Sequence, residues 1–117
     1  MTSADLHPIP DAACRRIPLP FEAINALLAR IADYFRGKER ALGRQYERAL
    51  DASDGVVLFA DVDFWDRAGD ALGFTDAETA AVQRAHETTL LLAGDREDRR
   101  AEFETALDVR TAVVLGR

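Results

Sequence analysis

The feature that most constrains the fold is a long run of helical periodicity between residues 21 and 50. Large apolar side chains recur at intervals of three and four: Phe21, Ile24, Leu27, Leu28, Ile31, Tyr34, Phe35, Leu42, Tyr46 and Leu50. This spacing places them on one face of an α-helix. Gly37 costs about 1 kcal/mol against alanine in a helix interior, so the run is one bent helix or two joined helices. We expect one long helix over about 21–51, with its apolar face as the spine of the core.

The opposite face of this stretch carries four arginines at steps of four residues: Arg36, Arg40, Arg44 and Arg48. On a helix they form a single ridge, which is suited to an anion or to an acidic partner protein. Three acids stand three residues from members of the ridge: Asp33, Glu47 and Asp51. The alternative interpretation is therefore an ordinary solvated face, in which Arg40 has no obvious local partner.

Composition indicates one globular domain, because the 117 residues are 48% hydrophobic and 31% charged. Residues 1–55 hold eight basic and eight acidic side chains, so the net charge of −6 arises from seven basic and thirteen acidic residues in 56–117. An acidic chain disfavours nonspecific nucleic-acid binding. A single cysteine excludes an internal disulfide, and neither a signal segment nor an apolar run of membrane length is visible. We expect a cytoplasmic protein.

Residues 1–20 contain all four prolines and predict an extended or partly disordered segment before a single helical domain over 21–117. His7 and Cys14 lie in this segment and His86 lies far along the chain. A structural zinc site needs four ligands with a close pair, so these three residues do not predict one. The sequence predicts no cofactor.

Residues 56–60 form an apolar run that has strand propensity. However, Leu58, Trp65 and Leu72 belong to a 4-3-4-3 stripe, which favours a helix begun by Ser53 or Asp54 and ended by Gly73. Three carboxylates share the face beside this stripe: Asp63, Asp66 and Asp70. They give a metal-binding or acid–base hypothesis. The alternatives are a solvated face bridged by Arg67, or a surface that meets the arginine ridge within the fold or between subunits.

The capping box of Thr75 and Glu78 predicts a helix that begins there and ends at Gly94. His86 lies at its core edge, and no nucleophile motif accompanies it. After residue 95 a second stripe predicts a helix to about Val113, with residues 111–115 as an alternative strand.

Residues 65–84, WDRAGDALGFTDAETAAVQR, resemble the helix-turn-helix of DNA-binding regulators. The resemblance rests on the small pair Ala68-Gly69, on the turn at Gly73 and on the core residues Leu72, Phe74 and Val82. It implies DNA reading by Gln83 and Arg84. The same pattern also describes an ordinary helical hairpin, and the acidic start of the second helix favours that alternative.

These observations predict an all-α protein: a bundle of four to five helices, with one long helix and an extended proline-rich N-terminal segment. Seven large residues should complete its core: Phe59, Trp65, Leu72, Phe74, Leu90, Phe103 and Leu107. We expect a non-enzymatic protein-interaction or self-association module that binds itself or another protein. The alternatives are a DNA-binding regulator using residues 65–84 and a metal or enzymatic site at Asp63, Asp66 and Asp70, with His86.

Overall fold

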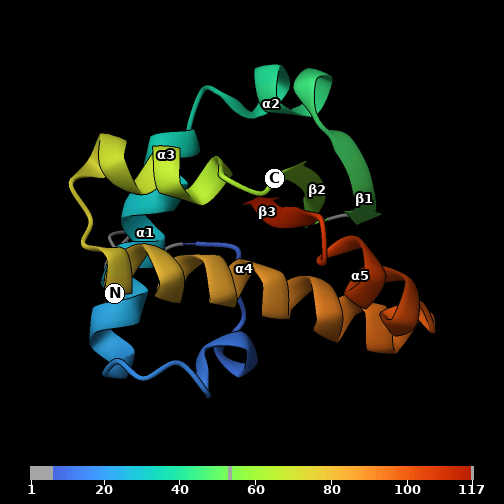
Figure 1. Cartoon of the computed structure of the whole chain (residues 1–117), viewed down its shortest axis with the longest axis horizontal. Helices are drawn as coiled ribbons and strands as arrows, with labels where there is room; N and C mark the ends of the chain where they lie inside the picture. Colours follow the sequence, from blue (N-terminus) through green and yellow to red (C-terminus); the bar gives the residue numbers. More distant parts are fainter. Residues whose placement is uncertain (1–6, 53, 117) are drawn as a thin grey trace.

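The structure is a computed structural model that describes residues 7–52 and 54–116. In its described part, helices surround a three-stranded antiparallel sheet with the order β1-β2-β3 (Figure 1). The elements along the chain are a 3-10 helix η2 (Asp11–Cys14), α1 (Phe21–Phe35), α2 (Glu39–Gln45), β1 (Glu47–Ala52), β2 (Gly55–Asp61), α3 (Phe64–Leu72), α4 (Asp76–Glu97), α5 (Arg100–Ala106) and β3 (Arg110–Gly116).

The all-α prediction is wrong, because both apolar runs that had strand alternatives are strands. Val56 pairs with Leu115 and Asp61 with Arg110, so β2 and β3 are in register along their whole length. Four consecutive residues of β2 are buried, since both faces of the sheet are covered. A strand buried on both faces shows no alternation, and a short apolar run of this kind cannot be told from helix by period alone.

The single helix predicted over about 21–51 is also wrong. Helix α1 ends at Phe35, and Gly37 follows with φ +86, a left-handed conformation that breaks the helix. A short helix, α2, begins at Glu39, and β1 occupies the residues that were expected to form the final turns. The apolar residues from Leu42 to Leu50 are therefore divided between a helix, α2, and a strand, β1, and their helical spacing does not reflect one continuous helix.

The predicted helix over 56–72 is divided between β2 and α3, and Val62 in the connection is 66% exposed. Gly73 ends α3 with φ +72, as expected. Helix α4 begins with the predicted capping box, in which Thr75 and Glu78 bond to each other's backbone N–H groups. It continues past Gly94, where the sequence predicted its end, to Glu97. A Cβ added at Gly94 would lie 2.8 Å from Phe103, so the glycine serves close packing against α5 and does not end the helix.

The predicted C-terminal helix to Val113 is wrong as well. Helix α5 stops at Ala106, and residues 110–116 form β3 in the centre of the molecule (Figure 1). Its partner β2 lies about fifty residues earlier in the chain, and local periodicity carries no information about such a pairing.

The N-terminal segment is not simply extended, because η2 interrupts it. Ile9, Ala13, Cys14 and Ile17 are buried in the same core as the sheet. Of the seven predicted core residues, five are buried and two, Leu72 and Leu107, are half-buried against the core. Residues 1–6 and the predicted cap Ser53 lie outside the described residues.

Candidate functional site

The four arginines of the predicted ridge do not share one helix but lie after α1, on α2 and on β1. Arg36 follows α1 and forms an ion pair with Asp33 at 2.7 Å, and Arg48 on β1 forms one with Asp51. Arg40 and Arg44 are exposed on α2, and no ion pair involves them in the part of the chain that the structure describes. Of the four arginines in the predicted ridge, only Arg40 and Arg44 on α2 are therefore outside the ion pairs of the described residues.

The carboxylates of the predicted acidic face lie at the start and along the outside of α3. Asp63 binds Arg67 at 2.6 Å, and Asp61 lies 3.8 Å from the same guanidinium. Asp66 and Asp70 are exposed, and neither is in an ion pair with another described residue. Arg67 therefore bridges Asp63 to Asp61, where the sequence suggested Asp70.

A metal site is not assembled from the described residues, among which no group of three or more histidine, cysteine, aspartate or glutamate side chains could hold an ion. His86 on α4 is 2% exposed, whereas Asp63, Asp66 and Asp70 are all exposed. Cys14 is buried in η2, and burial raises the pKa of its thiol, with Asp11 adding to the effect. The structure does not bring the predicted acidic face and His86 into one pocket.

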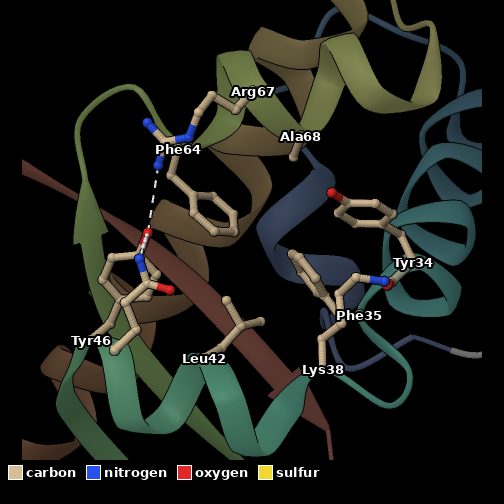
Figure 2. A pocket seen from close by; sticks show the side chains of 9 residues that line it. Tyr34, Phe35, Lys38, Leu42, Tyr46, Phe64, Arg67 and Ala68 are labelled. Carbon is tan, nitrogen blue, oxygen red and sulfur yellow. Dashed lines mark hydrogen bonds between the residues drawn. The ribbon is translucent and has the colours of Figure 1, made fainter.

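A cavity of about 210 Å3 lies beneath α2, between the end of α1 and one side of α3. We call it the α2 pocket, and its lining is Tyr34, Phe35, Lys38, Leu42, Gln45, Tyr46, Phe64, Arg67 and Ala68. Figure 2 shows the rings of Tyr34 and Phe64 on opposite sides of the space, with Leu42 of α2 closing the bottom. Aromatic walls with a few polar groups are typical of ligand sites.

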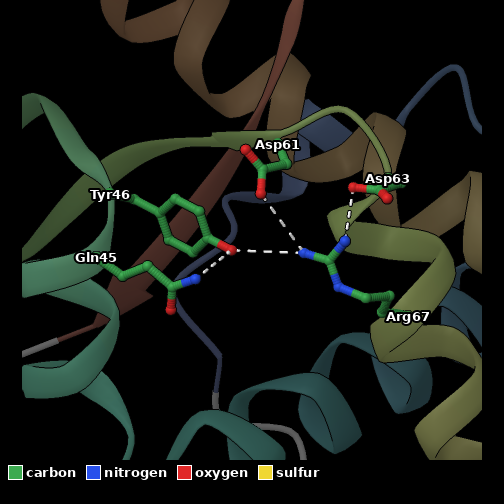
Figure 3. Close-up of polar contacts among 5 residues, drawn as sticks. All are labelled: Gln45, Tyr46, Asp61, Asp63 and Arg67. Atoms are coloured by element: carbon green, nitrogen blue, oxygen red, sulfur yellow. Dashed lines mark hydrogen bonds and ion pairs between the residues drawn. The ribbon is translucent and has the colours of Figure 1, made fainter.

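The polar edge of the α2 pocket is a hydrogen-bonded group centred on Tyr46 (Figure 3). The Tyr46 hydroxyl accepts hydrogen bonds from Gln45 Nε2 at 3.2 Å and from Arg67 Nη2 at 3.5 Å. Arg67 in turn donates to Asp63, and this bond raises the pKa of the guanidinium above its already high value. Arg67 is thus fully charged, and its hydrogen bonds link the start of α3 to Tyr46 at the end of α2.

On the other side of the α2 pocket, Lys38 donates from Nζ to the backbone oxygen of Tyr34 at 2.9 Å. Its ammonium also lies 4.6 Å from the centre of the Tyr34 ring, a cation–π distance. These two contacts hold a charge at the mouth of the cavity. Sequence reasoning missed this site, because its residues come from three elements whose mutual placement no local pattern reveals.

A larger groove of about 790 Å3 runs between residues 7–10, the end of the sheet and α4. Phe35 and His7 are the aromatic rings in its lining, and its charged groups have both signs: Arg36, Glu39, Asp54 and Arg96. It lacks the convergence of rings and fixed polar groups found in the α2 pocket.

The segment that resembles a helix-turn-helix does form a helical hairpin from α3 to α4. Its helices cross so closely at Gly69 that an added Cβ would lie 2.1 Å from Thr79 Oγ1. Of the two residues predicted to read DNA, Arg84 is exposed, whereas the half-buried Gln83 donates to Glu87 at 3.0 Å. The helical hairpin is therefore present, but Gln83, one of the two candidate DNA-reading residues, is hydrogen-bonded within α4.

His86 is a structural residue in this fold. Its Nδ1 accepts a hydrogen bond from the Val114 backbone N–H at 2.9 Å, and its ring lies 4.5 Å from that of Trp65. Burial, helped by the charge of His7, lowers the pKa of His86 to about 3. A neutral, enclosed imidazole of this kind cannot exchange protons with a substrate in solution at neutral pH.

No helix in the described ranges is long and apolar enough to cross a bilayer. Comparison of the chain with curated proteins gave no match, and comparison with solved structures gave none either. One family model, described as a domain of unknown function, matches residues 7–117, which is nearly the entire chain. The protein therefore belongs to the DUF8048 family.

Proposed function

We propose that this protein is a non-enzymatic self-association module that forms a symmetric dimer through the outer faces of α2 and α3. The observation that carries the proposal is the presence of unpaired charges of opposite sign on two helices that line the same pocket. Arg40 and Arg44 are exposed on α2, and Asp66 and Asp70 are exposed on α3. Within the described chain none of the four is in an ion pair, so all are available to a partner.

The placement of the two helices supports a two-fold arrangement. Both α2 and α3 contribute side chains to the α2 pocket, so the helix that carries the cationic pair and the helix that carries the acidic pair flank the same cavity. Figure 1 shows both helices along the upper side, with α4 below the sheet. A two-fold axis between them sets the arginines of each copy against the aspartates of the other, which makes the surface self-complementary.

The poor anchoring of α2 also supports an external contact. None of its seven residues is buried, although Leu42 packs partly against the core. Val62, in the connection just before α3, is an exposed apolar side chain. Exposed ion pairs contribute only about 0.2–1 kcal/mol each, so the apolar contacts must supply much of the affinity while the charges set the register.

The direct test is the molar mass in solution at about 0.05 M and about 0.5 M salt, because exposed charge pairs are screened as the Debye length falls. We expect twice the chain mass of 12.9 kDa at low salt and a shift toward monomer at high salt. The variant Arg40→Glu/Arg44→Glu should be monomeric at both. The control Arg15→Glu/Arg84→Glu makes the same charge change at two exposed sites elsewhere and should still dimerise.

Wild-type protein that is monomeric at every concentration and salt would contradict the proposal. Equal loss of the dimer in the control would also contradict it, because the effect would then follow net charge alone.

DNA binding through the α3–α4 hairpin is the second candidate, supported by the close crossing at Gly69 and by the exposed Arg84. The acidic first turn of α4, with Asp76 and Glu78, opposes an approach to phosphates. A mobility-shift assay with genomic fragments tests this candidate. Binding that is unchanged by Arg84→Ala would remove the proposed reading residue.

A further inference from the structure

We infer that residues 39–46, which comprise α2 and Tyr46, form a lid that opens over the α2 pocket while the rest of the fold stays intact. Closing of this lid is coupled to the proposed dimer, because Arg40 and Arg44 of the dimer surface lie on it. The coupling rests on the proposed function, whereas the opening itself does not. The inference is carried by the length of α2, the cavity beneath it, the few bonds that attach it and the hinge before it.

Helix α2 is too short to be stable on its own. It has seven residues, and isolated helices of fewer than about 12–15 residues are only marginally stable in water. Gly43 in its interior lowers its helix propensity further. The helix therefore depends on its attachment to the rest of the molecule.

The packing beneath α2 is incomplete. None of its seven residues is buried, and Leu42 packs only partly against the core. The α2 pocket, of about 210 Å3, lies beneath the helix and is lined by Leu42 and by the rings of Phe35 and Phe64 (Figure 2). Side chains that face such a space lack part of the contacts that hold a helix on a close-packed core. Leu42 therefore anchors the lid less firmly than a fully buried leucine would.

Few polar bonds attach the lid to the rest of the fold. Among the described residues, Glu39 accepts a hydrogen bond from the nearby Gly37 N–H, and Gln45 donates to the adjacent Tyr46 hydroxyl. The Tyr46 hydroxyl is the side-chain group of the lid that bonds to a distant element, α3, where Arg67 donates to it at 3.5 Å. That distance is longer than the usual range of about 2.7–3.2 Å, so this bond is weak.

The chain before the lid turns without strain. Gly37 has φ +86, a left-handed conformation that glycine adopts readily, and nothing lies within 4 Å of a Cβ built there. The chain is fixed on either side, because Phe35 is buried and Glu47 pairs with Phe59 in the sheet. Motion is thus confined between these two points. Opening uncovers the rings of Phe35 and Phe64, which are buried when the lid is closed.

The experiment is hydrogen exchange of the backbone amides, followed by NMR of 15N-labelled protein and corrected for intrinsic rates. The amides of Leu42 and Tyr46 are hydrogen-bonded at 2.9 and 3.0 Å, so they exchange only when the lid opens. The background is the variant Asp66→Arg/Asp70→Arg, which disrupts the proposed dimer contact and leaves the sequence of the lid unchanged. We expect both amides to exchange about a hundredfold faster than that of Leu90, which is buried in α4.

Two alanine-to-glycine variants separate opening of the lid from unfolding of the whole chain. Ala41 in α2 and Ala80 in α4 are both exposed. Glycine lowers helix stability by a similar amount at each site, equivalent to about fivefold in an equilibrium constant. Ala41→Gly should speed exchange of the Tyr46 amide about fivefold. Ala80→Gly should speed exchange at Leu90 about fivefold and leave Tyr46 unchanged, because it does not touch the lid.

The coupling to the dimer is tested in the wild-type protein. Exchange of the Tyr46 amide should slow as the protein concentration rises, because the dimer contact needs the closed lid. In the Asp66→Arg/Asp70→Arg background the same amide should exchange at a rate that does not depend on concentration.

Exchange of Leu42 and Tyr46 as slow as that of Leu90 would overturn the opening of the lid. Equal acceleration of Tyr46 and Leu90 by Ala80→Gly would overturn it as well, since both amides would then report unfolding of the whole chain. A wild-type dimer in which Tyr46 exchange is independent of concentration would overturn the coupling alone. A wild-type protein that is monomeric throughout removes the proposed dimer and the coupling, while fast exchange of the lid would still support the opening.

Discussion

Trp65 and His86 bond to neighbouring peptide groups on the same edge of β3. The indole Nε1 donates to the Ala112 oxygen at 3.1 Å, and His86 Nδ1 accepts from the Val114 N–H at 2.9 Å. The two rings lie 4.5 Å apart, one from α3 and the other from α4. They act together as a side-chain substitute for a fourth strand.

This pair matters because β3 is an edge strand, and an open edge invites pairing with another chain. The other edge, β1, is protected differently. Its register shifts between Arg48 and Leu50, and Arg99 Nη1 lies 3.4 Å from the Ala49 oxygen. Both edges of the sheet are thus protected against pairing with a strand of another chain. We therefore expect a second copy to bind at the helix surfaces.

The buried imidazole makes stability depend on pH. The folded-state pKa of His86, about 3, lies below the unfolded value of about 6.5, so the unfolded chain binds more protons between these limits. Stability is therefore complete above pH 6.5 and falls as the pH falls toward 3. We expect a loss of about 2 kcal/mol between pH 7 and pH 5, measured by urea unfolding.

The chain has two histidines, so His7→Gln is a matched control and should keep this slope. His86→Gln should flatten it between pH 5 and pH 7, above the range in which carboxylates titrate. A wild-type stability that does not change across this interval would show that His86 is not held in its neutral form.

Trp65→Phe should destabilise the fold by about 2 kcal/mol. The change leaves the Ala112 oxygen without its buried donor and removes part of the stack on His86. Phe64→Leu is the matched control, because Phe64 is a neighbouring buried ring without a polar atom, and it should cost less. Circular dichroism must report the unfolding, since Trp65 is the sole tryptophan. Equal costs for the two variants would argue against a role for the indole N–H.

Two glycines in helices should respond in opposite directions to alanine. Gly69→Ala should destabilise by about 2 kcal/mol or more, because its Cβ would overlap Thr79 at the α3–α4 crossing. Gly43 in α2 has open space around its Cα, so Gly43→Ala should stabilise by up to about 1 kcal/mol through helix propensity. Thermal unfolding of both variants measures the difference. Similar shifts in the same direction would mean that the close crossing is not the constraint on Gly69.

The elements that could be predicted from sequence are those with local signals. The start of the first helix beside Pro20, the end of α3 at Gly73 and the capping box of Thr75 each depend on a few adjacent residues. The strands depended instead on partners far along the chain, and the spacing from Leu58 to Leu72 matched a helix although it crosses from β2 into α3.

The candidate site was predictable only in part. Exposed arginines and aspartates were identified, but their distribution on α2 and α3 required the break at Gly37 and the strand β2. The α2 pocket has no sequence signal, because Tyr34 and Tyr46 belong to the apolar stripe of residues 21–50 and Phe64 belongs to none of the predicted motifs.

The central claim is that α2 of one copy meets α3 of another, and a charge exchange tests it most directly. Two variants are needed, Arg40→Glu/Arg44→Glu and Asp66→Arg/Asp70→Arg, each measured alone and in an equimolar mixture by sedimentation velocity. Each variant alone places like charges across both halves of the contact and should be monomeric. In the mixture both halves regain opposite charges, so a one-to-one dimer should form. A mixture that remains monomeric, or either variant dimerising alone as wild type does, would contradict the claim.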